Sequence, residues 1–65
     1  MLNKLIMEWS KEIKQLREAL CLSQTEFAQL LGVSFVSVNR WENGHFEPTI
    51  KIKRKILKYI KDFKL

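Results

Sequence analysis

The sequence predicts a small all-α domain of four helices, and three observations lead to this fold class. The chain has 65 residues, a length that allows one domain with a modest core. Its apolar residues recur with the 3.6-residue period of amphipathic helices, and no segment alternates with period two as a strand would. Gly32, Gly44 and Pro48 are the only glycines and the only proline, and they separate the helical segments.

The first predicted helix covers residues 2–20. Its apolar side chains fall within one arc about 100° wide on a helical wheel. They are Leu2, Leu5, Ile6, Trp9, Ile13, Leu16 and Leu20. Because this stripe keeps its phase through Ser10, we expect one continuous helix rather than two.

The second predicted helix is short and has a clear start and end. Ser23 is a predicted N-cap, and Glu26 three residues later completes a capping box. The helix is expected to end at Leu31, because Gly32 can take the left-handed conformation that stops a helix.

The third predicted helix spans residues 35–43 after a cap at Ser34, with Val38 and Trp41 facing inward. The fourth begins after a cap at Thr49 and runs to the end of the chain. One arc of this last helix is apolar and contains Ile52, Ile56, Tyr59, Ile60 and Phe63. The opposite side carries lysine and arginine.

The apolar start of the first helix needs a covering surface. We expect the end of the fourth helix to fold back onto it with three side chains, Ile60, Phe63 and Leu65. A second copy of the chain is the alternative, for which Ile50 and Leu57 offer apolar surface in the charged sector of the last helix.

Positive charge is concentrated at one end of the chain. Residues 1–48 contain five Lys/Arg and six Asp/Glu, a net of −1, whereas residues 49–65 contain seven and one, a net of +6. A basic segment on a near-neutral body indicates a polyanionic partner, with nucleic acid before an anionic membrane. A solvated lysine-rich face is the competing explanation.

Several classes of function are disfavoured. Cys21 is the only cysteine and His45 the only histidine, so neither an intramolecular disulfide nor a zinc site is expected. The composition suits a reducing cytoplasm. Charged residues interrupt the first twenty positions, which disfavours a secretory or membrane-spanning segment. No nucleophile–base–carboxylate set is present, so we expect no enzyme activity and no cofactor.

The spacing of Ala28, Gly32 and Val38 indicates how the second and third helices meet. A small residue lets the next helix cross closely, and a glycine four positions later makes a tight turn. A β-branched residue six positions after that fills the junction. This spacing is typical of a helix-turn-helix, here over residues 24–43, whose second helix enters the major groove of DNA.

The stretches LSQTEFAQLLGVS and VNRWENG resemble the Cro/phage-repressor (XRE) family of DNA-binding domains. The resemblance covers residues 13–50. It implies a lambda-repressor-like fold with extended first and last helices, so that residues 1–65 form a single helix-turn-helix domain. It also implies an ion pair between Arg17 and Glu42, which would tie the first helix to the end of the third.

The outward side of the third helix supplies the candidate base contacts, namely Phe35, Val36, Asn39 and Arg40. In the family, the positions that match Phe35, Val36 and Arg40 reach base edges. Arg40 could donate two hydrogen bonds to guanine, and Asn39 could pair with adenine. Phe35 and Val36 suit thymine methyl groups, although they could instead cover a neighbouring protein surface.

The candidate backbone contacts surround that helix. They are Gln24, Ser34, Ser37, Asn43 and His45. The resemblance places Gln24 at the start of the second helix, where free N–H groups and the helix dipole favour a phosphate. Ser34 is also a helix cap.

These observations lead to a hypothesis of function with alternatives. We expect a regulator that binds double-stranded DNA as a homodimer on a two-fold symmetric site and represses by occupying its operator. The main alternative is an antitoxin-type protein, in which the same fold also binds a protein toxin. A membrane-surface role for the basic fourth helix would leave the helix-turn-helix spacing unexplained, so we expect no membrane partner.

Overall fold

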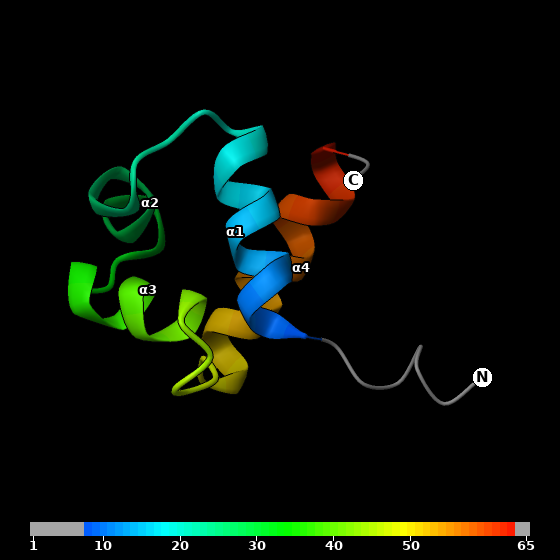
Figure 1. The fold of residues 1–65 in the computed structure, drawn as a ribbon. Helices are drawn as coiled ribbons and strands as arrows, with labels where there is room; N and C mark the ends of the chain where they lie inside the picture. Colours follow the sequence, from blue (N-terminus) through cyan, green and yellow to red (C-terminus); the bar gives the residue numbers. More distant parts are fainter. Residues whose placement is uncertain (1–7, 64–65) are drawn as a thin grey trace.

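The computed structural model describes residues 8–63, and four helices form the fold (Figure 1). They are α1 (Trp9–Ala19), α2 (Gln24–Leu31), α3 (Phe35–Glu42) and α4 (Ile50–Phe63). Helices α1 and α4 lie side by side and run in the same direction, with α2 on the other side of α1. Since the described residues contain no strand, the predicted all-α class is confirmed.

Helix α1 begins at Trp9, later than the periodic stripe predicts. The preceding Glu8 is extended, with φ −87° and ψ 91°, and makes no capping hydrogen bond through its side chain. The predicted continuous helix is therefore wrong at Glu8, and residues 2–7 lie outside the described residues. Helical periodicity can continue across a cap, and no capping side chain in the sequence marks this start.

The predicted N-caps are confirmed for the other three helices. The Ser23 hydroxyl accepts from the Glu26 N–H and the Glu26 carboxylate accepts from the Ser23 N–H, which completes the capping box. Ser34 caps α3 through its hydroxyl. The Thr49 hydroxyl accepts from the backbone N–H of Ile52 in the first turn of α4.

Three helices end in the same way, with a residue of positive φ directly after the helical turn. These residues are Cys21 (59°), Gly32 (74°) and Gly44 (77°). After α3, Gly44 donates to the Trp41 carbonyl and His45 donates to the Arg40 carbonyl, both at 3.0 Å. This pair of bonds is the Schellman motif, which satisfies the last carbonyl groups and reverses the chain.

One apolar core joins all four helices. Its buried members are Ile13, Leu16, Phe27, Ala28, Leu31, Val38, Trp41, Ile52 and Ile56. Ala28 and Val38 are both buried where α2 crosses α3, as the spacing around Gly32 predicts. This core leaves the remaining sides of α3 and α4 to the solvent.

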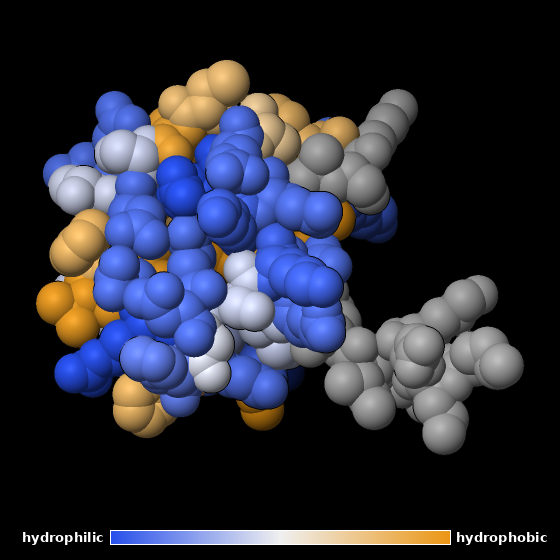
Figure 2. All heavy atoms as spheres, viewed as in Figure 1, coloured by the Kyte–Doolittle hydropathy of each residue, from blue (hydrophilic) through white to orange (hydrophobic). Residues whose placement is uncertain are grey.

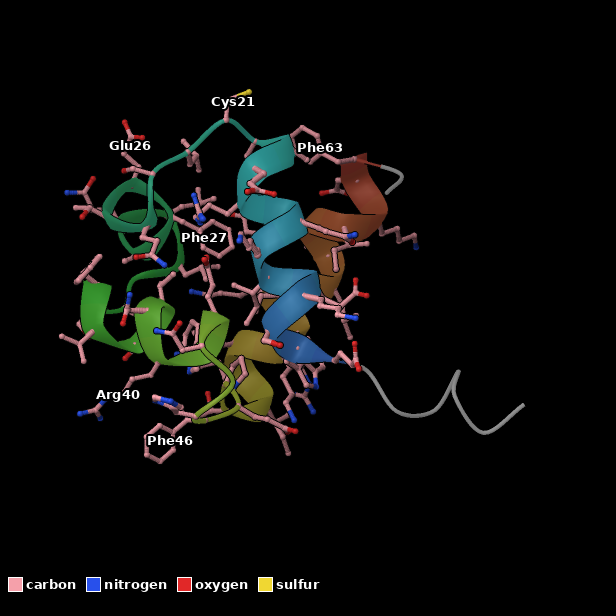
Figure 3. The ribbon with its side chains drawn as sticks, viewed as in Figure 1. Cys21, Glu26, Phe27, Arg40, Phe46 and Phe63 are labelled. Atoms are coloured by element: carbon pink, nitrogen blue, oxygen red, sulfur yellow. The ribbon has the colours of Figure 1, made fainter. Side chains whose placement is uncertain are left out.

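The prediction that the end of α4 covers the start of α1 is wrong for the residues that the structure describes. Lys53, near the start of α4, lies over the Trp9 ring at 5.1 Å from its centroid. Phe63 is 51% exposed and lies near the other end of α1 (Figure 3). Because the two helices run in the same direction, the end of α4 cannot reach the start of α1. Leu2, Leu5, Ile6 and Leu65 lie outside the described residues.

Neither a membrane-spanning helix nor a metal site is found in the described part of the chain. Among residues 8–63, no helix has both the length and the apolar character needed to cross a bilayer. Within the same range, no group of three or more His, Cys, Asp or Glu side chains is placed to hold a metal ion.

Candidate nucleic-acid interface

Helix α3 buries one side and exposes the other. Val38 and Trp41 anchor it in the core, whereas Phe35 is 47% exposed and Val36 is 51% exposed. Arg40 is also exposed, and its side chain points away from the domain (Figure 3). Figure 2 shows apolar side chains at the edge of the molecule where α3 begins, next to a mostly hydrophilic face. The outer side of α3 is therefore free to contact a large partner.

A two-pronged ion pair fixes α3 against α1. Arg17 Nε lies 2.7 Å from Glu42 Oε2, and Arg17 Nη2 lies 3.1 Å from Glu42 Oε1. A third donor, Arg17 Nη1, reaches the Leu22 carbonyl at 3.0 Å. The hydrogen bond to the Glu42 carboxylate raises the pKa of Arg17 above its ordinary value. The side chains are 16% and 6% exposed, so this pair is largely removed from solvent.

A chain of side-chain amides continues from Glu42 toward the surface. Gln24 Nε2 donates to Glu42 Oε1 at 3.0 Å, and Asn39 Nδ2 donates to Gln24 Oε1 at 3.3 Å. Asn43 Nδ2 then donates to Asn39 Oδ1 at 3.1 Å. One network thus contains two residues predicted to contact the DNA backbone, Gln24 and Asn43, and one predicted to contact a base, Asn39.

The Glu42 carboxylate determines the orientation of these three side-chain amides. An ionised carboxylate only accepts hydrogen bonds, so it must receive the NH₂ group of Gln24. The Gln24 carbonyl then faces Asn39, and the Asn39 carbonyl faces Asn43. Both ends of the Asn39 amide are therefore engaged within the protein, which leaves fewer of its groups for the pairing with adenine that the sequence suggested. Each NH₂ group has two donors, and each contact in the network uses one.

The remaining predicted backbone contacts lie at the two ends of α3. Ser34 and Ser37 lie at its start, with their hydroxyl oxygens 3.2 Å apart. His45 is exposed in the loop after the helix. None of the five predicted backbone contacts is a lysine or an arginine, so they would bind phosphate as neutral donors or through histidine.

The structure also places a residue at this interface that the site prediction omitted. The guanidinium carbon of Arg40 lies 5.5 Å from the centroid of the Phe46 ring. Phe46 is 59% exposed in the loop between α3 and α4. A large apolar residue inside an otherwise polar loop was the available signal, but its partner lies six positions earlier and is brought close only by the reversal at Gly44.

The basic residues of α4 divide into two groups. Lys53 pairs with Glu47 at 2.8 Å, and Lys55 donates to the Leu31 carbonyl at 3.3 Å. These two cations therefore help to hold α4 on the domain. Four others are exposed along the helix and together form a surface that we call the basic ridge of α4, namely Lys51, Arg54, Lys58 and Lys61.

Two short helices crossing at a glycine turn, with the second exposing one full side, define a helix-turn-helix protein. The family model described as Helix-turn-helix matches residues 13–61, and this chain belongs to that family in its XRE type. It is a family of DNA-binding transcription regulators. No curated protein and no solved structure matches the chain significantly.

Proposed function

We propose that this protein is a sequence-specific repressor that binds double-stranded DNA with α3 in the major groove. The observation that carries the proposal is the exposure of Val36 and Arg40 on a helix whose opposite side is buried by Val38 and Trp41. The major groove is about 12 Å wide and admits one helix with its side chains. The protein would repress transcription by occupying its operator.

The base contacts follow from the chemistry of the exposed side. Arg40 donates two hydrogen bonds to O6 and N7 of a guanine, which gives about 1–3 kcal/mol of discrimination. Phe35 and Val36 pack against thymine methyl groups. Asn39 contributes through the amide N–H that its bond to Gln24 does not use.

The backbone contacts set the register of the protein on the duplex. Gln24 binds a phosphate with its second amide N–H at the start of α2, where the helix dipole favours negative charge. Ser34 and Ser37 bind at the start of α3, while Asn43 and His45 bind beyond its end.

A second copy of the chain completes the proposal. Ile50 and Leu57 are exposed on α4 and lie seven residues apart, so they share one side of the helix. This apolar pair supplies the contact for a homodimer on a two-fold symmetric site. In sedimentation with operator DNA, we expect two protomers per duplex, and Leu57→Asp should bind with one protomer at a time.

Selection of bound sequences from a random duplex pool tests the proposed function. We expect enrichment of a two-fold symmetric motif that contains a guanine in each half. The Arg40→Ala variant should lose the preference at that guanine and retain the rest of the motif. A bound pool with no enriched sequence would contradict sequence-specific regulation.

A second candidate is the antitoxin-type protein, favoured by the exposure of Phe35 at the start of α3 and of Phe46, whose ring lies next to Arg40. A protein toxin could bury these rings. Co-expression with the product of the adjacent gene tests this function. If the product of the adjacent gene stops growth and co-expression of this protein restores it, the antitoxin function is supported. An adjacent gene product that does not affect growth would contradict it.

A further inference from the structure

The ring of Phe46 lies next to the only cation of α3. The distance of 5.5 Å between Arg40 Cζ and the ring centroid falls within the range of about 6 Å at which a guanidinium and an aromatic face attract each other. Figure 3 shows both side chains together on the outer side of the domain, away from the core. This contact therefore favours one arrangement of the Arg40 side chain, with the modest strength of an exposed pair.

The backbone fixes the position of Phe46 from both sides. Before it, Gly44 and His45 donate hydrogen bonds to carbonyl groups in the last turn of α3. After it, Pro48 is buried, and this proline restricts Glu47, the residue between Phe46 and Pro48, to extended conformations. The ring is thus presented by a loop that is tied to the helix carrying Arg40.

Packing of the core does not explain a phenylalanine at this position. The side chain is 59% exposed. Phe46 lines a surface cavity of about 280 Å³ together with Trp9 and Trp41. A residue with more than half of its surface in the solvent contributes less to packing than a core residue does, so the contact of Phe46 with Arg40 is the more informative one.

We infer that Phe46 is a positioning residue for sequence readout, an inference that rests on the proposed DNA-binding function. The ring attracts the flat face of the guanidinium, whereas the N–H donors of the guanidinium lie in its plane. The contact therefore leaves these donors free for guanine. It also restricts Arg40 before binding, which reduces the loss of side-chain freedom when the complex forms.

Three substitutions separate the aromatic contact from other effects. Phe46→Leu keeps an apolar side chain and removes the ring, whereas Phe46→Trp keeps an aromatic face. Phe63→Leu is the matched control, because Phe63 has similar exposure and lies at the far end of α4. Affinities are measured on the duplex selected by the wild-type protein and on a duplex in which the guanine of each half is replaced. Thermal melts show that each variant is folded.

Phe46→Leu should weaken binding to the selected duplex about threefold and leave binding to the replaced duplex unchanged. In a protein that already carries Arg40→Ala, Phe46→Leu should cause no further loss of affinity. Phe46→Trp should restore wild-type discrimination, and Phe63→Leu should match the wild type on both duplexes. An equal loss on both duplexes, or a loss that persists without Arg40, would overturn the inference.

A measurement on the protein without DNA distinguishes this inference from the proposed function. In NMR spectra, the ring of Phe46 should shift the side-chain proton signals of Arg40 upfield, and Phe46→Leu should remove that shift. Absence of the shift in the wild type would overturn the positioning role. A wild-type protein that shows the shift and selects no DNA sequence would instead overturn the proposed function, together with the guanine readout that depends on it.

Discussion

Arg17 connects three parts of the fold through one side chain. It contacts Glu42 at the end of α3 and the Leu22 carbonyl before α2, and the carboxylate it pairs with also receives Gln24. Its planar fork of donors suits this arrangement, which a lysine could not reproduce. The ion pair therefore holds α3 in place and fixes the amides that lead to its outer surface.

Arg17→Ala should destabilise the fold by about 3 kcal/mol, the low end of the range for a buried pair, since it leaves the partly buried Glu42 carboxylate without its cation. Thermal or denaturant unfolding measures this loss. Lys14→Ala is the control, because Lys14 is exposed on the same helix. If Arg17→Ala unfolded at the wild-type midpoint, the pair would have no structural role.

Cys21 takes a backbone conformation that suits glycine. Its φ of 59° lies in the left-handed region, and it donates its N–H to the Glu18 carbonyl in the turn that ends α1. Cys21→Gly should stabilise the protein by about 0.5–1 kcal/mol, because a side chain is strained there. Equilibrium unfolding would show this gain, while Cys21→Ala should show none. A destabilised glycine variant would mean that the thiol makes a contact of its own.

At the scale of single residues, the sequence predicted which side chains of α3 are exposed better than it predicted which groups they contact. Val36 and Arg40 are exposed as the helical wheel predicted, because burial of Val38 and Trp41 fixes the rotation of the helix. The network around Asn39 could not be predicted, since it depends on where Gln24 meets Glu42 across two helices. The exposure of Phe46 was expected from the sequence, but its contact with Arg40 was missed for the same reason.

The elements were predictable where a local signal existed. Both ends of α2 are confirmed, because a capping box and a glycine act within a few residues of the backbone they satisfy. The start of α1 was wrong, because Glu8 carries no capping hydrogen bond through its side chain. The prediction for α4 was also wrong in part, because its end does not pack on the start of α1. The direction in which a helix packs is set by the whole core.

The capping box of α2 should contribute to stability with a defined pH dependence. Hydrogen bonds from the Ser23 backbone and hydroxyl lower the pKa of Glu26 below its usual value of 4.5. A lowered pKa in the folded state means that this stabilisation is present above about pH 4.5 and is lost as the pH falls through the folded-state value.

Glu26→Gln removes that titration and should make the fall in stability below about pH 4.5 shallower than in the wild type. Chemical unfolding measured at several pH values between neutral and acid provides the comparison. Glu12→Gln, in the first turn of α1, serves as the control. Identical pH profiles for the wild type and Glu26→Gln would exclude this contribution.

Charge is distributed unevenly over the whole molecule. The candidate base and phosphate contacts include one arginine, whereas the basic ridge of α4 carries four exposed cations, Lys51, Arg54, Lys58 and Lys61. Helix α4 lies on the other side of α1 from α2 (Figure 1). Under the proposed function, long-range attraction to DNA and reading of its sequence would therefore fall to different elements, and the ridge would add phosphate contacts outside the groove.

Affinity for DNA should depend strongly on salt. Each neutralised phosphate contributes about 0.9 to the slope of log K against log salt, so three such contacts would weaken binding about forty-fold between 50 and 200 mM salt. Titrations over that range measure the slope. Replacing the four ridge cations with glutamine should reduce it, and an affinity that is independent of salt would contradict the electrostatic part of the account.

An NMR titration of the wild-type protein with its selected duplex tests the central claim most directly. Because the outer side of α3 is proposed to lie in the major groove, the largest shifts should occur at Phe35, Val36 and the Nε–H of Arg40. Smaller shifts are expected at the start of α2. If the largest shifts instead occurred along α4 while those of α3 stayed unchanged, the assignment of α3 as the reading helix would be wrong.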